Sequence, residues 1–165
     1  MTQHTATVSH RNGRRPGGAW AGYLAAAWAL VFALISVYWA AGGTLGVASV
    51  GAAVAGATSG LLVWAAAVLK FVGVAFSLAL VRPWGRRLPR RPLLALDYVV
   101  SVLLMLYGAV NIIGELLVVT GAVAGGTDSY ALHWHLYLWD PAFLLWGVCL
   151  FIAGRYYSAT TRRPA

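Results

Sequence analysis

The sequence is poor in charged residues, and above all in acidic ones. Only 10% of its 165 residues are charged, and aspartate and glutamate together contribute four. A soluble domain of this length carries roughly a quarter charged residues. Because 61% of the residues are hydrophobic, a soluble fold could not bury so much apolar surface, and we expect lipid to cover it. The composition therefore predicts an integral membrane protein.

Cysteine is almost absent. The only one, Cys149, lies within an apolar run, and one thiol cannot form an internal disulfide. No CxxC pair and no zinc-type Cys/His spacing occurs. This excludes the thiol–disulfide chemistry of quinone-linked membrane oxidoreductases, and we expect neither a bound metal nor a cofactor.

The net charge of +8 suggests a nucleic-acid partner, but the distribution of the charge excludes one. The arginines fall into three groups that precede, separate and follow apolar runs. They are Arg11, Arg14 and Arg15, then Arg82, Arg86, Arg87, Arg90 and Arg91, then Arg155, Arg162 and Arg163. Such groups are typical of the positive-inside rule, and no globular domain remains to present a basic patch to nucleic acid.

Four apolar runs predict four membrane-spanning helices, over about residues 20–41, 61–81, 94–120 and 141–157. The first run is longer than the apolar region of a signal peptide, so we expect it to be retained as a helix. The expected fold class is all-α, a polytopic membrane protein whose four transmembrane helices form a bundle over residues 20–157. A disordered basic tail is expected over 1–19 and a short tail over 158–165.

The basic segments also predict the orientation. Both termini and the loop over 82–91 should be cytoplasmic, while the connections over 42–60 and 125–140, which contain no Lys or Arg, should face outward. The loop over 82–92 contains three prolines and a glycine, so we expect it to form a stiff, non-helical turn.

Polar residues inside the second and third apolar runs cost free energy on insertion into a membrane, so their presence is informative. Lys70 lies near the middle of the second run, where lysine costs about 2.5–3.5 kcal/mol. In the third run one stripe of a helix carries Asp97, Ser101, Gly108, Asn111 and Glu115. Asn111 lies at about the depth of Lys70 and Glu115 about one turn away, so Glu115 is the predicted partner of Lys70.

Two interpretations of these residues stay open. Lys70, Asn111 and Glu115 form either a closed polar network that fixes helix packing, or the lining of an outward-facing cavity suited to proton transfer. Asp97, at the arginine-rich end of its run, is expected to be a solvated charge near the helix start.

The stretch HWHLYLWDPAFLLWG, residues 133–147, collects aromatic and ionisable residues. Asp140 before Pro141 predicts the start of the fourth helix. Trp139, like Tyr38 and Trp39 at the end of the first run, is typical of an interfacial aromatic belt.

His133 and His135 allow three interpretations, as solvated interfacial residues, as acid/base or substrate-contacting groups, or, less favoured, as metal ligands with Asp128 and Asp140. Folding of residues 128–140 over the helix ends would gather the polar groups in one outward-facing crevice. The candidate catalytic residues are Glu115, Asp140, His133 and His135. The candidate ligand-binding residues are Lys70, Asn111, Tyr38, Trp39 and Trp139.

Three segments carry a resemblance to a known family: VYWAAGGTLG at 37–46, Lys70, and HLYLWDPAFLLWG at 135–147. The chain resembles an uncharacterised family of small four-helix integral membrane proteins from actinobacteria, over nearly the whole apolar region. The resemblance implies an architecture and a location in the bacterial plasma membrane. It implies no activity.

Three functions fit the sequence. The favoured one is a non-catalytic accessory or binding protein with a polar site facing the outer leaflet. The alternative is an intramembrane acid/base enzyme, of isomerase or cyclase type, acting on a lipid or isoprenoid-like substrate. The third is a small transporter. Expected partners are membrane lipid, a lipid-like small molecule, and a second copy of the chain or another membrane protein.

Overall fold

The computed structural model describes residues 17–51, 60–124 and 128–162, and helices dominate these segments. The long helices are α1 (Ala19–Ala40), α3 (Leu61–Ala79), α4 (Arg90–Val119) and α6 (Asp140–Thr160). Shorter helical segments are η1 (Val47–Val50), η2 (Pro83–Arg87), α5 (Ser129–Trp134) and η3 (His135–Trp139). The described residues contain no strand, so the predicted all-α fold class is confirmed.

Four helical segments are long and apolar enough to cross a membrane. They are α1, α3, α4 and the continuous run of α5, η3 and α6 from Ser129 to Thr160. The predicted tails fall mainly on residues 1–16 and 163–165, and parts of the two predicted outer connections fall on 52–59 and 125–127. All four of these ranges lie outside the described residues.

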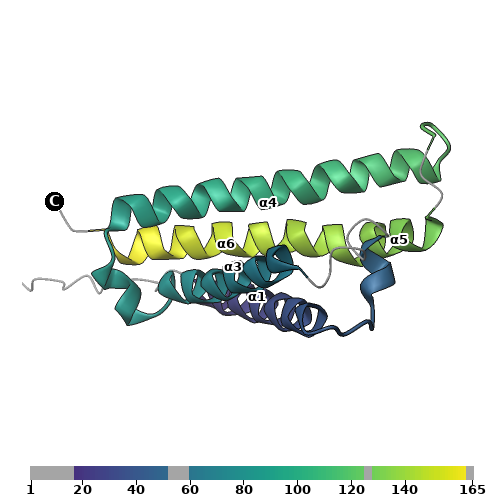
Figure 1. The fold of residues 1–165 in the computed structure, drawn as a ribbon. Coiled ribbons are helices and arrows are strands. Elements are labelled where there is room, and N and C mark those ends of the chain that lie inside the picture. The colour runs from purple at the N-terminus through teal and green to yellow at the C-terminus, as the bar shows by residue number, and fades with distance from the viewer. Residues whose placement is uncertain (1–16, 52–59, 125–127, 163–165) are drawn as a thin grey trace, which may run out of the picture.

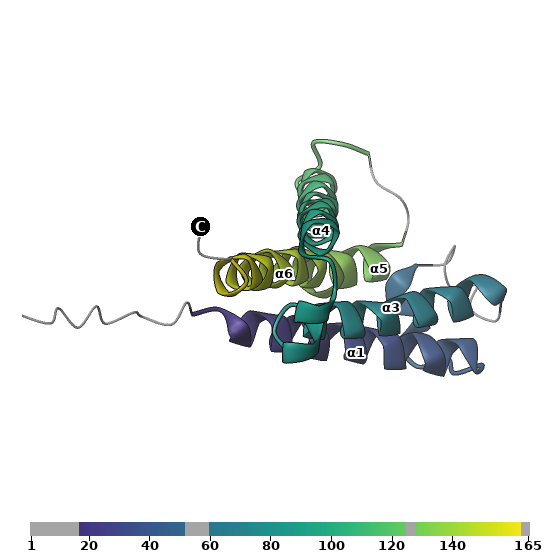
Figure 2. The ribbon, with the colours of Figure 1, turned by 90° about the vertical axis from the view of Figure 1, so that its left-hand side faces the viewer.

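The helices form two hairpins, and the largest contact between them is that of α1 with α6. α1 packs against α3, α4 packs against α6, and α1 also contacts α6. In Figure 1 the α4 helix forms an outer layer over α6, and the α1–α3 hairpin lies on the other side of α6. Figure 2 shows α4 almost end-on while α1 and α3 run across the view, so the two hairpins cross.

The segment before Pro141 is helical, and this corrects a prediction. A connection was expected over 125–140, yet helix begins at Ser129 and continues through Pro141. The helix start is capped by Asp128 instead of Asp140, because the Asp128 carboxylate accepts a hydrogen bond from the Ala131 amide at 3.0 Å. Pro141 is the second residue of α6, in its first turn, where proline is tolerated.

The opposite end of the molecule is held by hydrogen bonds that join the start of α4 and the turn before it to the end of α6. The predicted non-helical loop over 82–92 instead contains the single turn η2, and α4 already begins at Arg90. Arg90 donates from Nε to the Thr161 hydroxyl at 3.0 Å, and the Tyr157 hydroxyl donates to the Gly85 carbonyl at 3.1 Å. These bonds fix the start of α4 against the end of α6.

Glycines let α4 and α6 approach to backbone contact. A Cβ atom placed on Gly108 would lie 2.6 Å from the Asp140 carbonyl oxygen, and one on Gly147 would lie 2.7 Å from that of Ser101. Ser101 and Gly108 are fully covered on the α6-facing side of α4. The polar stripe predicted for the third helix is therefore the seam of the α4–α6 hairpin.

Asp97 is buried in this seam, which corrects the expectation of a solvated charge. Its side chain is 0% exposed, and neither carboxylate oxygen has a hydrogen-bond partner within the described part of the chain. Because α4 begins at Arg90, Asp97 lies about two turns inside the helix. Its carboxylate packs directly against Gly154 of α6, where a Cβ would require the Asp97 side chain to move.

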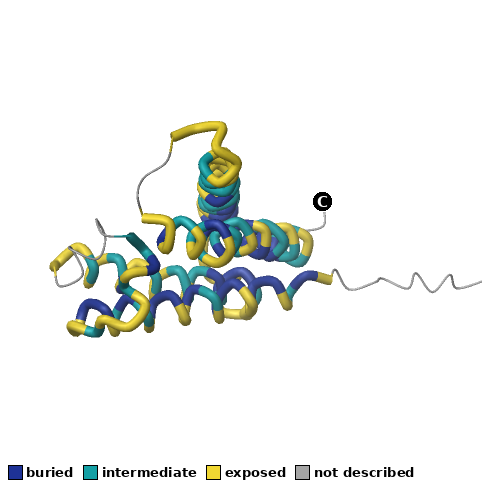
Figure 3. The backbone as a smooth tube through the Cα atoms, turned by 90° about the vertical axis from the view of Figure 1, so that its right-hand side faces the viewer, coloured by how far each residue is buried: buried dark blue, intermediate teal, exposed yellow. Residues whose placement is uncertain are grey.

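Burial is uneven across the helices. Alanines at four-residue spacing bury one face of α1 completely, namely Ala21, Ala25, Ala29 and Ala33. The outer helix α4 instead exposes large apolar side chains such as Leu103 and Val110, at 60% and 63%. Figure 3 shows the buried backbone concentrated where the layers meet. The exposed apolar side of α4 is the surface expected of a helix that faces lipid.

The seam predicts a contrast between two glycines of α4. Gly108→Ala should destabilise the protein by about 1–3 kcal/mol, because the added methyl overlaps backbone atoms of α6. Gly114→Ala is the matched control, since a Cβ there meets nothing within 4 Å, and it should be neutral or stabilise by up to about 1 kcal/mol. Thermal unfolding in detergent measures both. Equal melting temperatures for the two variants would contradict the close backbone contact of α4 and α6 at Gly108.

Candidate functional site

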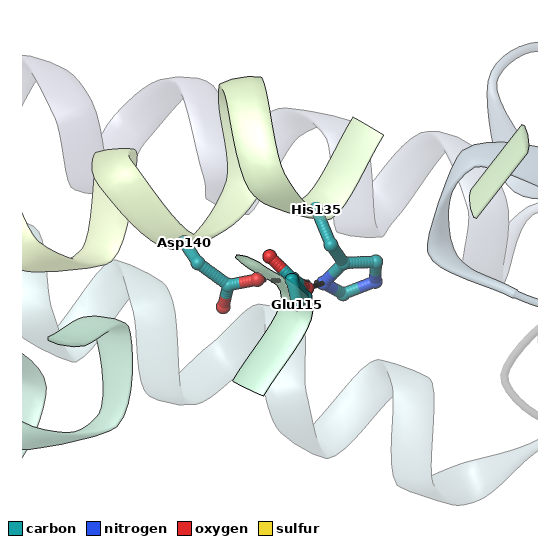
Figure 4. A group of neighbouring side chains, drawn as sticks. All are labelled: Glu115, His135 and Asp140. Carbon is teal, nitrogen blue, oxygen red and sulfur yellow. Dashed lines mark hydrogen bonds and ion pairs between the residues drawn. The ribbon is translucent and has the colours of Figure 1, made fainter. Parts of the chain in front are cut away.

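Three ionisable side chains from two helical segments meet at the α5 end of the α4–α6 hairpin. His135 Nδ1 lies 3.0 Å from Asp140 Oδ2 and 3.9 Å from Glu115 Oε1. In Figure 4 the three side chains point toward one another, Glu115 from α4 and the other two from the η3–α6 segment. We call Glu115, His135 and Asp140 the carboxylate–histidine cluster.

The π-helical turn η3 explains why His135 and Asp140 lie together. Five residues along a regular α-helix rotate the side chain by about 140° away from the first. The η3 segment, His135–Trp139, is a π-helix, whose i→i+5 hydrogen bonds widen the turn. Positions five apart then face the same side, and both side chains point toward α4.

Asp140 is the most buried member of the cluster. Its side chain is 0% exposed, and Asn111 Nδ2 donates to its Oδ1 at 3.0 Å. Its other oxygen, Oδ2, accepts from His135 Nδ1 when that nitrogen carries the proton. Glu115 is 14% exposed, and its Oε2 is buried with no hydrogen-bond partner in the described segments. The Asp140 carboxylate is therefore held from two sides, while Glu115 keeps an unused acceptor.

The cluster opens into a cleft of about 380 Å³ at the α5 end. Asn111, Glu115 and His135 line this α5-end cleft together with Tyr107 and Asp128. Tyr107 and His135 also line a second space of about 220 Å³, the aromatic pocket, so the two spaces adjoin.

The aromatic pocket is walled by rings that contact one another. Phe32 lies 5.7 Å from Trp139 and 5.4 Å from Phe143, and Trp39 meets Trp139 edge-on at 6.1 Å. Both indole N–H groups are satisfied outside the pocket, by the Leu45 carbonyl for Trp39 and by the Ser49 hydroxyl for Trp139. The rings therefore present apolar faces to the pocket, and their polar atoms anchor the η1 segment.

A third space adjoins the aromatic pocket through Lys70 and Phe143. This lateral groove, of about 430 Å³, is lined by α3, α4 and α6, and almost all of its lining side chains are apolar. Among the described residues that line it, Lys70 is the only charged one. The three spaces thus lead from a polar end at the cluster to an apolar end between α3 and α4.

Lys70 has a different partner from the predicted one. Its Nζ donates to the Ser36 hydroxyl of α1 at 2.8 Å, while Glu115 is paired with His135. α3 packs on α1, and the lateral groove lies between α3 and α4. The prediction that Lys70 pairs with Glu115 is wrong because it rested on depth alone, and depth cannot tell which helices are neighbours.

The predicted site residues divide into those that converge and those that do not. Glu115, His135, Asp140 and Asn111 meet in the cluster, and Lys70, Trp39 and Trp139 line the aromatic pocket. His133 is exposed and its Nδ1 lies 2.6 Å from the Ser129 carbonyl of its own helix. Tyr38 is 46% exposed and its hydroxyl accepts from the Leu45 amide. These two therefore lie outside the site.

Several lining residues were missed by the sequence reasoning, among them Tyr107, Ser36 and Phe143. Tyr107 precedes Asn111 by four residues and Glu115 by eight, so the helical spacing already placed it on the polar stripe. Ser36 and Phe143 carried no comparable signal. Ser36 is an ordinary small residue of an apolar helix, and Phe143 lies in a run where most residues are apolar.

The chain belongs to the family described as "Protein of unknown function (DUF3995)", whose model matches residues 29–150. The predicted membership of an uncharacterised family is thereby confirmed. The matched range includes all three residues of the cluster and Lys70. No curated protein and no solved structure matches the chain.

The Lys70–Ser36 contact predicts that a carboxylate introduced at residue 36 is strongly coupled to Lys70. Ser36→Asp should be tolerated beside Lys70, but in a Lys70→Met background it should cost about 3 kcal/mol or more, because the buried carboxylate is left unpaired. Thermal unfolding of the single and double variants measures the difference. A Glu115→Gln background serves as control and should leave the Ser36→Asp effect unchanged. If Glu115→Gln, instead of Lys70→Met, changed the cost of Ser36→Asp, the observed Lys70–Ser36 pairing would be contradicted.

Proposed function

We propose that this protein is a non-catalytic membrane protein that binds a lipid-like amphiphile. The polar end of the ligand would lie at the carboxylate–histidine cluster, and its apolar chain would follow the aromatic pocket into the lateral groove. The observation that carries the proposal is the succession of three adjoining spaces, which changes from polar to apolar along its length.

The chemistry of the two ends supports an amphiphile over a purely polar ligand. The α5-end cleft offers carboxylate, amide and imidazole groups from Glu115, Asn111 and His135. The lateral groove offers aliphatic and aromatic side chains, among them Leu104, and about 430 Å³ of space. Ligand sites are commonly apolar with a few placed polar groups, and an acyl or isoprenoid chain has the shape to fill such a groove.

One observation favours a second candidate, an intramembrane acid/base enzyme on the same class of ligand. His135 Nδ1 lies within 3.0 Å of one carboxylate and 3.9 Å of another, so a proton could pass between them beside the bound head group. The two candidates differ in the fate of the ligand. A binding protein returns its lipid unchanged after prolonged incubation, and an enzyme returns an isomer or a cyclised product.

We further propose that the four apolar helices span the bacterial plasma membrane with both termini in the cytoplasm. The arginines of η2 and those near the end of α6 lie at one end of the helices, and the carboxylate–histidine cluster lies toward the other. The positive-inside rule then assigns the arginine-rich end to the cytoplasm. In this orientation the α5-end cleft faces outward.

Blocking the lateral groove should reduce ligand binding. Ala66→Phe places a ring in the groove, and an overpacking cost of about 1.4 kcal/mol would lower the affinity for the ligand about tenfold and so reduce its occupancy. The measurement is mass spectrometry of lipids that co-purify in mild detergent. Ala65→Phe is the matched control, because Ala65 is exposed and does not line the groove. The same lipids at the same occupancy in both variants would overturn the proposal.

Orientation is tested with single cysteines and a membrane-impermeant maleimide on intact cells. Thr44→Cys, in the exposed turn after α1, should be labelled, and Arg86→Cys in η2 should react only after lysis. The native Cys149 is buried and should give little background. Labelling of Arg86→Cys on intact cells would reverse the proposed topology.

A further inference from the structure

We propose that the carboxylate–histidine cluster binds a divalent first-row transition-metal ion. The three donors are a carboxylate oxygen of Glu115, Nδ1 of His135 and a carboxylate oxygen of Asp140. The sequence allowed metal ligation only as a less favoured interpretation, with His133, His135, Asp128 and Asp140 as the ligands, and Glu115 was not among them.

The donor atoms lie close to the spacing that one ion requires. One ligand atom from each residue lies within 4.8 Å of the other two. For metal–ligand bonds of about 2.0–2.2 Å, two donors on the same ion are separated by at most about twice that length. The three side chains therefore need only small rotations to share an ion.

Charge gives the second reason. Asp140 is 0% exposed and Glu115 is 14% exposed, so two carboxylates occupy a poorly solvated site. In the part of the chain that the structure describes, His135 is the only cation-forming side chain that pairs with either of them. When both carboxylates are ionised, even a protonated His135 leaves one negative charge uncompensated, which is costly in a site of low dielectric constant. A divalent cation with a neutral His135 balances the charge.

Groups around the donors have the arrangement found at metal sites. Asn111 donates to the Asp140 oxygen that does not face His135, as groups behind a metal ligand do when they orient it. Glu115 Oε2 is buried without a hydrogen-bond partner in the described segments, which leaves this oxygen free to ligate an ion. The α5-end cleft, which Glu115 and His135 line, supplies an entry path and room for further ligands.

The ligand set also indicates the class of ion. One imidazole and two carboxylates suit borderline to hard divalent ions such as Zn²⁺, Mn²⁺ and Fe²⁺, and the site offers no thiolate or thioether for a soft ion such as Cu(I). Three protein ligands leave at least one coordination position open. That position would face the α5-end cleft, where a small molecule or a ligand head group could take it.

This inference does not rest on amphiphile binding. The donors lie at the polar end of the site, and Ala66 lies in the lateral groove. Loss of lipid in Ala66→Phe with unchanged metal binding would support both proposals separately. The two can thus fail independently.

The test is isothermal titration of the full-length protein with Zn²⁺ in detergent, after purification through a histidine-free affinity tag and removal of metals with a chelator. Wild type should bind about one Zn²⁺ per chain through its three protein ligands. Glu115→Gln and Asp140→Asn remove a negative donor at constant shape, and each should abolish this stoichiometric binding. Circular dichroism and gel filtration check that both variants remain folded.

Two further variants separate ligation from structure. His135→Ala should lose the ion, and His133→Ala should keep it, because His133 is exposed outside the cluster. Asn111→Ala should retain binding but weaken it about 10- to 100-fold, as expected for a residue that positions a ligand. The proposal is overturned if wild type binds no stoichiometric Zn²⁺, as would happen where a shared proton balances the carboxylates, or if His133→Ala and His135→Ala bind it equally.

Discussion

The close approach of α4 and α6 is the constraint on which the site depends. Gly108 and Gly147 bring the two backbones into direct contact, and a larger residue at either position would separate the helices. Gly108 abuts the Asp140 carbonyl, so this contact fixes the residue that begins α6. Asn111, one turn further along α4, can then reach the Asp140 side chain. Backbone packing and the polar cluster are thus parts of one contact.

The π-helical turn η3 brings His135 to the same side as Asp140, and so completes the carboxylate–histidine cluster. Without the wider turn of η3, His135 would point about 140° away from Asp140, and Asp140 would be buried beside α4 with only Asn111 as a partner. π-helical turns are rare and often occur at functional sites. Here the turn also sets Trp139 against Phe32, so the same irregularity places the histidine over the carboxylates and an aromatic ring in the pocket wall.

The sequence predicts the helices and the polar stripe well, because apolar length and helical spacing are local properties. The sequence predicts less well which of these residues come together in the fold. Asp140–Pro141 has the pattern of a helix start, but Asp128 caps the helix instead, since a short irregular turn allows helix to continue through a proline. The partner of Lys70 was mispredicted because neighbouring helices in the chain, α3 and α4, are separated by a groove. Which helices become neighbours depends on how the two hairpins cross, and this crossing is a property of the whole fold.

The few ionisable residues of the helices are not paired with one another in the way that would best stabilise the fold. Asp128 caps a helix, and Asp97 is buried without a partner in the described segments, so neither forms an ion pair that would hold helices together. Lys70 bonds to a hydroxyl, which leaves the carboxylates of Glu115 and Asp140 uncompensated by lysine. A chain selected only for packing would gain by pairing or losing these charges, because unpaired buried charges are costly. Their separation leaves an anionic end and a cationic position along the same series of adjoining spaces.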